Sequence, residues 1–563
     1  MFTKETEERT LFSRRDIVKQ GVLASGAGVL AIAGLASCGP LEKSGGEKEG
    51  ASGEDAGWDE EYDVLVVGSG CGLYAALVAA QEGASVCVIE KASLLGGTTA
   101  LSGNMCWVPN NRHMEEEGIE EASPSQILSY LVAADAYCDA RPEILEHFVA
   151  HARDTFSYLE DDIQLPMGIR MSLPLRGDYY DLPGALPQGR SMDFLDSEGK
   201  PAGNKTIEKL ILPKIQEKGV VTKTETTLRS LIIDEDGTVI GLTAKGKGNK
   251  TIRLKGKKAV ILASGGFDWN ESMVNAYLRG PLFSSVGVDS NTGDGHRAAL
   301  EIGAALGNMQ NCWGVQAIIV DDAEGYSKVS DWGTYRSKPN SLLVNQKGRR
   351  FTNEASSYST CNPSFYAYDT STCSYMNIPA FLVFDQTYVD YYGFPGVKTK
   401  EGEKPSMPSY VSSFDSLSDL AVAFSIDEDN LLDEVSRFND FAKSGNDPDW
   451  HRGRWEFDTK ANGDSAHKQE GLANSCMGPV EHAPFYCLKM GPGCCGTSGG
   501  VLVNKNAQAI SAVTGQPIGG LYAMGNCAAS IFGSAYPGSG ATVGAGIFQG
   551  LMAVQHALGY NKY

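Results

Sequence analysis

The chain of 563 residues is poor in positive charge and in metal-binding patterns. It holds 48 Lys and Arg against 69 Asp and Glu, a formal net charge of −21. Such a surface repels a phosphate backbone, so nucleic-acid binding is disfavoured. The 13 cysteines include no C-x-x-C or C-x-x-C-H spacing, so we expect no c-type haem and no conventional iron–sulfur cluster, and we interpret the cysteines as structural thiols. The 8 histidines lack ligand spacing, and the pair His147/His151 is interpreted as a solvated helix face, so no metal site is expected.

The N-terminal region has the composition of an export signal. Arg14 and Arg15 precede an apolar, Gly/Ala-rich run from Gly21 to Ser37, which is typical of a twin-arginine signal and too short for a permanent membrane span. Leu35-Ala36-Ser37-Cys38 fits a lipobox, in which Cys38 takes a lipid, and ordinary cleavage without lipid is the alternative. Residues 1–38 are therefore predicted to be a twin-arginine lipoprotein signal. Residues 39–59, rich in Gly, Glu, Lys and Ser, are predicted to be a flexible linker, and the protein is expected to be extracytoplasmic and lipid-anchored at the cell membrane.

A dinucleotide-binding pattern follows directly. Tyr62–Val67 reads as a strand, Leu73–Gln81 as a helix, and Ala84–Ile89 as a second strand that ends at Glu90. Gly68-Ser69-Gly70-Cys71-Gly72 lies between the first strand and the helix. Glycines there permit a tight turn and close approach of a pyrophosphate, the helix N-terminus offers free N–H groups, and Glu90 can accept from ribose hydroxyls. Leu73 stands where the third glycine of G-x-G-x-x-G belongs, so we infer a turn one residue shorter, with Gly72 allowing helix and strand to approach.

Further glycine clusters are spread over the chain. The segment from Gly96 to Gly103 is too glycine-dense for a helix, Ala259–Leu262 is a strand that leads into Ser264-Gly265-Gly266, and Gly520–Ala523 leads into Gly525-Asn526. This distribution is explained if residues distant in sequence bind one long ligand together. We expect that ligand to be non-covalent FAD. The expected cofactor-binding residues are Gly68, Ser69, Gly70, Cys71, Gly72, Glu90, Lys91, Gly96, Gly97, Thr98, Thr99, Ser102, Gly103, Ser264, Gly265, Gly266, Gly525, Asn526, Ala541, Thr542 and Val543.

The chain from about Glu60 onward resembles the FAD-dependent superfamily of succinate dehydrogenase, fumarate reductase and the 3-ketosteroid dehydrogenases. It is most similar to the 3-ketosteroid Δ1-dehydrogenase branch in four spaced segments. These are Gly96–Gly103 leading to Trp107-Val108-Pro109, Asp178-Tyr179-Tyr180, Arg350-Phe351-Thr352-Asn353-Glu354, and Ala535-Tyr536-Pro537-Gly538-Ser539-Gly540-Ala541-Thr542.

Three residues in two segments separate the branches of this superfamily. Tyr358 stands where fumarate-type reductases carry a catalytic arginine, and Phe532 and Tyr536 stand where they bind a carboxylate with a histidine and an arginine. A dicarboxylate would be desolvated here without compensation, so fumarate and urocanate are poor candidates. A carboxylate ene-reductase of the same fold stays open as an alternative, as does a non-enzymatic ligand-binding lipoprotein.

The resemblance implies roles for three tyrosines and a glycine. Tyr536 hydroxyl and the Gly540 N–H would hold the carbonyl oxygen of a cyclic ketone or enone, as an oxyanion hole. Tyr358 would exchange the proton on the α-carbon, Tyr179 would hydrogen-bond Tyr358 and ease its ionisation, and hydride would move between flavin N5 and the β-carbon.

These residues also set the expected architecture. The fold class is α/β, a Rossmann-like FAD-binding domain of residues 60–311 and 497–563 with an inserted α+β substrate-capping domain of residues 312–496. The last helix is expected over Ala545–Leu558, after the glycines from Gly540 to Gly544. An exported flavoprotein cannot use cytoplasmic NAD(P)H, so a separate membrane or extracytoplasmic electron carrier is expected, and the reductase direction is modestly preferred.

Overall fold

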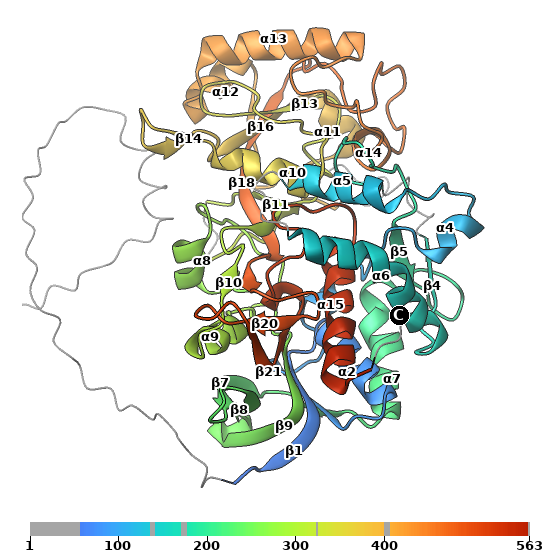
Figure 1. Cartoon of the computed structure of the whole chain (residues 1–563). Helices are drawn as coiled ribbons and strands as arrows, with labels where there is room; N and C mark the ends of the chain where they lie inside the picture. Colours follow the sequence, from blue (N-terminus) through green and yellow to red (C-terminus); the bar gives the residue numbers. More distant parts are fainter. Residues whose placement is uncertain (1–56, 136–140, 170–176, 322–324, 399–405, 561–563) are drawn as a thin grey trace, which may run out of the picture. The chain divides into compact units, whose positions relative to one another are not determined.

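An eight-stranded sheet forms the framework of the part of the protein that carries the glycine turns (Figure 1). The structure is a computed structural model that describes residues 57–135, 141–169, 177–321, 325–398 and 406–560, and Asp59–Tyr563 make up one compact unit. The predicted signal and nearly all of the predicted linker lie outside the described residues. Within the described part, no helix is long and apolar enough to cross a bilayer.

The middle of this sheet is parallel. Strand β1 (Glu60–Val67) pairs in parallel with β2 (Val86–Ile89) on one side and with β9 (Thr251–Leu262) on the other. The sheet continues through β6 (Val221–Lys223) beyond β2 and through β21 (Pro517–Ala523) beyond β9, both parallel. Residues from both ends of the chain thus meet in one sheet.

Three antiparallel strands complete this sheet. They are β7 (Thr227–Ile233), β8 (Val239–Lys245), which pairs with β9, and β20 (Gln508–Ile510), which pairs with β21. Because a βαβ crossover places its helix on a face of the sheet, the parallel strands are buried on both faces and read as continuous apolar runs, as in Val64–Val67.

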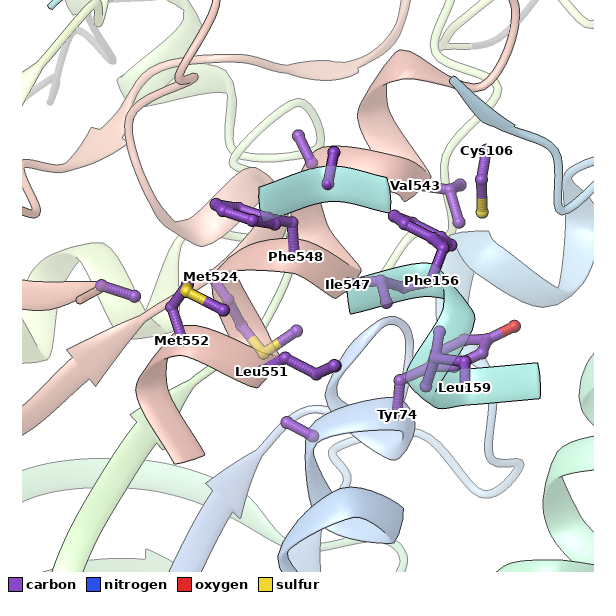
Figure 2. Packing of buried hydrophobic residues seen from close by; sticks show 14 of the residues in the cluster. Tyr74, Cys106, Phe156, Leu159, Met524, Val543, Ile547, Phe548, Leu551 and Met552 are labelled. Atoms are coloured by element: carbon purple, nitrogen blue, oxygen red, sulfur yellow. The ribbon is translucent and has the colours of Figure 1, made fainter. Parts of the chain in front are cut away.

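Three helices cover one face of the sheet with a common core. Helix α2 (Gly72–Gln81) packs against α15 (Ala541–Leu558), and α6 (Pro142–Asp161) covers α15 from the other side (Figure 2). Tyr74, Phe156 and Phe548 meet there, all less than 3% exposed. Burying side chains of this size stabilises the fold by about 2 kcal/mol each. This packing fixes the N-termini of α2 and α15.

A six-stranded antiparallel sheet forms the second framework. Its strands are β11 (Cys312–Ile318), β12 (Ser330–Asp331), β13 (Ser341–Val344), β16 (Ala380–Phe384), β17 (Ser412–Phe414) and β18 (Phe485–Thr497). Helices α12 (Leu417–Phe424) and α13 (Glu428–Ser444) cover it, at the top of Figure 1. The α/β fold with a parallel sheet and a separate antiparallel sheet is therefore confirmed, while the exact domain boundaries stay predictions.

Three local expectations were wrong. The segment after Gly96 does contain a short helix, α3 (Gly97–Leu101), because Gly96 takes a positive φ of 117° and turns the chain into it. Helix α15 begins at Ala541 instead of Ala545, since Gly540 (φ 91°) ends the preceding turn. His147 is half-buried against Phe548 with its Nε2 3.2 Å from Met552 Sδ, and burial lowers its pKa to about 4, so the His147/His151 pair is not a solvated face.

Candidate functional site

A cavity of about 760 Å³ lies along the carboxyl ends of the parallel strands and reaches strands β11 and β18 of the antiparallel sheet. Most predicted site residues line it. Those that do are Gly68, Ser69, Gly70, Cys71, Glu90, Lys91, Gly97, Thr98, Thr99, Ser102, Gly103, Tyr179, Ser264, Gly265, Tyr358, Gly525, Asn526, Tyr536, Gly540, Thr542 and Val543. Four do not reach its surface, namely Gly72, Gly96, Gly266 and Ala541.

The turn after β1 is shaped by close backbone contacts. Gly68 has φ 102°, and a Cβ there would come within 2.3 Å of the Ala263 carbonyl oxygen at the end of β9. A Cβ on Gly72 would come within 2.9 Å of both Val66 and Ala263. Gly72 therefore allows α2 to approach the strands, which is the role that its spacing predicts, although it does not line the cavity.

Glu90 closes the end of β2 over this turn. Its Oε2 accepts hydrogen bonds from Ser69 N at 3.0 Å and Ser69 Oγ at 2.6 Å, and its Oε1 accepts one from Ala92 N at 2.8 Å. The carboxylate is 6% exposed and still faces the cavity, where it has capacity to accept from a ligand hydroxyl. The neighbouring Lys91 already has partners within the protein, since its Nζ donates to Thr292 Oγ1 at 2.6 Å and to Asp294 Oδ2 at 3.1 Å.

Three tyrosines converge at the other end of the cavity. Tyr179 hydroxyl donates to Tyr358 hydroxyl at 3.1 Å, and Tyr179 and Tyr536 rings stack with centroids 5.4 Å apart. The Tyr358 ring packs edge-on against Tyr536 at 5.8 Å. The expected pairing of Tyr179 with Tyr358 is thus present, and all three tyrosines line the same cavity as Gly540.

Hydrogen bonds made by the neighbouring residues Asp178 and Tyr180 position two of these tyrosines. Asp178, 1% exposed, accepts from Trp107 Nε1 at 2.8 Å and Arg190 Nη1 at 2.5 Å, which anchors the segment that bears Tyr179. The Tyr180 hydroxyl accepts from Tyr536 N at 3.2 Å. Tyr180 therefore supports the site through the backbone.

Tyr358 begins helix α10 (Tyr358–Cys361). Ser357 caps this helix by accepting from Thr360 N, and Gln316 Nε2 on β11 donates to the Tyr358 carbonyl at 2.8 Å. These contacts fix where the Tyr358 ring enters the cavity.

Burial raises the pKa of both Tyr358 and Tyr536 well above that of a free phenol. The role of Tyr179 in easing the ionisation of Tyr358 stays a prediction, because the resting structure shows their contact and not a step of the reaction. At neutral pH both hydroxyls carry their protons, so each can donate a hydrogen bond.

Sequence reasoning missed several residues that complete the pocket. Trp313 packs edge-on against Tyr536 at 5.1 Å, Trp332 against Tyr358 at 4.9 Å, and Phe457 against Tyr179 at 4.9 Å. Cys495 lines the cavity and donates its thiol to the Trp313 carbonyl at 3.3 Å. No local pattern marks the three aromatic residues, whereas Cys494-Cys495 was visible as the approach to Gly496-Thr497. The eleven cysteines that the structure describes are free thiols.

The Arg350–Glu354 segment has a structural role next to the site. Arg350 forms a bidentate pair with Glu354 at 2.7 Å and also bonds Asp447 at 2.8 Å, and these side chains are buried. Asn353 Nδ2 donates to Asp458 Oδ2 at 2.9 Å. This network holds the loop that leads to Tyr358. In the described residues, no group of His, Cys, Asp or Glu side chains could hold a metal ion.

Comparison with known proteins gives consistent matches over nearly the whole folded region. A family described as FAD binding domain matches residues 63–543. The chain is 33% identical to 4-oxocyclohexanecarboxylate 2-dehydrogenase of Sinomonas cyclohexanicum, covering 87% of this chain and 92% of that protein. It is 31% identical to 3-oxosteroid 1-dehydrogenase of Mycolicibacterium smegmatis, covering 88% and 96%.

A solved structure is similar as well. The 3-ketosteroid Δ1-dehydrogenase of Sterolibacterium denitrificans, in complex with 1,4-androstadiene-3,17-dione, superposes with a TM-score of 0.75 at 29% identity, covering 89% of this chain and 99% of that chain. A flavocytochrome c3 fumarate reductase at 22% identity and a TM-score of 0.61 shares the fold.

Proposed function

The chain belongs to the FAD-binding family that matches residues 63–543 and is an FAD-dependent oxidoreductase acting on CH–CH groups, and from that premise we propose that it acts on the bond between the α- and β-carbons of an uncharged cyclic ketone or enone. The observation that carries the proposal is the cluster of Tyr179, Tyr358 and Tyr536, which lines the same cavity as Gly540.

The cavity fits FAD. Gly68 and Gly70 lack side chains where a pyrophosphate would approach the backbone, and Glu90 keeps acceptor capacity for a ribose hydroxyl. Gly525, Asn526 and the start of α15 would surround the flavin ring, where the helix N-terminus favours negative charge. When bound, FAD would supply the hydride chemistry of its N5 atom.

Tyr536 and Gly540 would hold the carbonyl oxygen of the substrate. Tyr536 is neutral, so its hydroxyl donates, and Gly540 is the N-cap of α15, where backbone N–H groups lack intrahelical acceptors. Two such donors stabilise the enolate oxygen more than the ketone oxygen, which lowers the barrier for reaction at the α- and β-carbons.

Tyr358 would transfer the proton at the α-carbon. In the reductive direction it must start protonated and give its proton to the enolate, and its raised pKa favours that state. In the oxidative direction it must accept a proton, for which a neutral phenol is a poor base. Since an exported enzyme would lack cytoplasmic NAD(P)H and would receive electrons from a separate carrier, we keep reduction of an enone as the proposed direction.

The charge of the lining favours a neutral substrate. Among the described residues that line the cavity, the charged ones are Glu90, Lys91 and Asp294, and these lie together at the dinucleotide turn. A substrate carboxylate near the tyrosines would lose its hydration without meeting a cation, which costs several kcal/mol. A 3-oxosteroid-like neutral ring system is thus favoured over a 4-oxocyclohexanecarboxylate-like one.

Export and anchoring complete the proposal. The twin-arginine signal and the lipobox at Cys38 lie outside the described residues, and their sequence supports an extracytoplasmic, lipid-anchored enzyme. Such an enzyme would receive electrons from a separate membrane or extracytoplasmic carrier.

The test supplies reduced viologen and a panel of cyclic enones to the FAD-loaded protein, and separately the saturated ketones with an artificial acceptor. The panel pairs neutral ketones with matched ring ketones that carry a carboxylate. We expect reduction of neutral enones. Turnover only of carboxylated rings would overturn the substrate class, and turnover only with saturated ketones would overturn the direction.

A further inference from the structure

A third hydroxyl continues the tyrosine pair on the side away from Tyr358. Ser539 Oγ lies 2.9 Å from Tyr179 hydroxyl, and Tyr179 hydroxyl donates to Tyr358 hydroxyl at 3.1 Å. A phenol carries one proton. Since Tyr179 donates its one hydroxyl proton to Tyr358, Ser539 must be the donor in the hydrogen bond to Tyr179.

The three hydroxyls therefore form a chain with one direction. Ser539 donates to Tyr179, Tyr179 donates to Tyr358, and Tyr358, which lines the cavity beside Tyr536, is the end of the chain that a substrate can reach. Hydrogen bonds in such a chain polarise one another, so each donor upstream makes the next hydroxyl a stronger donor.

Ser539 is held firmly in this position. It is 1% exposed, its carbonyl accepts from Ser191 Oγ at 2.9 Å, and Gly538 before it bridges to Asp178. Gly540 after it begins α15. Its side chain is thereby fixed between Tyr179 and the cavity wall.

We propose that Ser539 is a positioning residue for proton transfer, which acts on Tyr358 through Tyr179. This rests on the proposed function. When Tyr358 gives its proton to the α-carbon of the substrate enolate, the O–H bond of Tyr358 breaks, a C–H bond forms, and negative charge appears on the Tyr358 oxygen. Tyr179 donates to that oxygen, and Ser539 strengthens the donation. Solvent returns the proton to Tyr358 after product leaves.

The test is a double-mutant cycle in the FAD-loaded protein. Reduced enzyme is mixed with an enone that the wild type accepts, and flavin reoxidation is followed in H2O and in D2O. Ser539→Ala should slow the reaction about five- to tenfold with little change in KM, and should raise the solvent isotope effect. Ser539→Cys keeps a weaker donor of similar size, so its rate should lie between those of wild type and Ser539→Ala.

The effect of Ser539→Ala is then measured again in a Tyr179→Phe variant, and this comparison decides whether Ser539 acts through Tyr179. If Ser539 acts through Tyr179, Ser539→Ala has no further effect once the Tyr179 hydroxyl is absent. An equal effect of Ser539→Ala in both backgrounds, or an unchanged isotope effect, would overturn the inference and leave a packing role. Ser191→Ala, which removes a hydroxyl bonded to the Ser539 backbone, controls for local packing, and melting temperatures confirm that each variant folds. A wild-type enzyme that no enone reoxidises would instead refute the proposed function itself.

Discussion

Tyr179 and Tyr536 stack with their ring planes 18° apart, although 356 residues separate them in the chain. The backbone reinforces the stack, since Tyr179 N donates to the Pro537 carbonyl at 3.0 Å and Tyr130 hydroxyl donates to the same oxygen at 2.5 Å. The two tyrosines thus come from segments that are hydrogen-bonded to each other through the backbone. A rigid pair of this kind suits a site that must hold one oxygen atom in a fixed place.

The first prediction concerns the cofactor. Purified protein should hold about one FAD that denaturation releases intact, because the glycine turns bind a dinucleotide without a covalent link. Absorbance of the supernatant after heat or acid precipitation, with chromatography against FAD and FMN standards, measures this. FMN in the supernatant, or flavin that stays with the precipitated protein, would contradict it.

Tyr536→Phe tests the oxyanion donor. Loss of this hydroxyl should lower kcat on the order of a hundredfold, with flavin still bound, because a preorganised donor acts mainly on the enolate. The ring stack with Tyr179 is kept, so the melting temperature should stay near that of the wild type. Steady-state kinetics and the flavin spectrum are the measurements, and wild-type turnover would exclude Tyr536 from the reaction.

Tyr358→Phe tests the proton donor. Proton transfer to the α-carbon should be blocked, so turnover should fall by about a hundredfold or more while the protein stays folded. Because burial raises the pKa of Tyr358 well above its ordinary value, wild-type enone reduction should show no loss from this group between pH 6 and 9. A pH profile of kcat/KM checks this, and a steep fall near neutrality would mean that the acid is another group.

Asp458 should make stability depend on pH. Burial raises its pKa to about 6, above the ordinary value of about 4, so the folded state favours the protonated form. The stability that comes from this proton is fully present below about pH 4 and is lost as the pH rises through 6. The free energy of unfolding of Asp458→Asn, measured relative to that of wild type, should therefore increase by about 1–3 kcal/mol as the pH rises from 4 to 7.5.

Urea unfolding of the FAD-loaded proteins at several pH values measures this difference. Asp440→Asn, which removes an exposed carboxylate on α13, is the matched control and should show no such trend. A constant offset between Asp458→Asn and wild type across the pH range would contradict the assignment.

Local sequence was sufficient for the dinucleotide turn and for the approximate elements around it. The β1, Gly68–Gly72 and α2 sequence specifies a strand, a turn and a helix within about twenty residues, and glycine is required at Gly68 by its positive φ and its contact with Ala263. The sequence also predicted the strand Ala259–Leu262 that ends in glycines, whereas its parallel pairing with β1 came from the tertiary structure. Such features depend on backbone geometry and short-range periodicity, which composition encodes directly.

The tertiary structure decided the rest of the site. Trp313 and Phe457 contact the tyrosines from segments more than a hundred residues away in sequence, and Trp332 lies outside any motif around Tyr358, so no spacing could mark these three residues. The burial that raises the pKa of Tyr358 was likewise not visible in the sequence, because a hydrogen-bond partner can be inferred from a motif whereas desolvation depends on everything packed around the group. The sequence by itself determined the cofactor fold and the pairing of Tyr179 with Tyr358. Only the folded chain decided which aromatic residues enclose the tyrosines and how deeply their hydroxyls are buried, since both follow from distances in three dimensions.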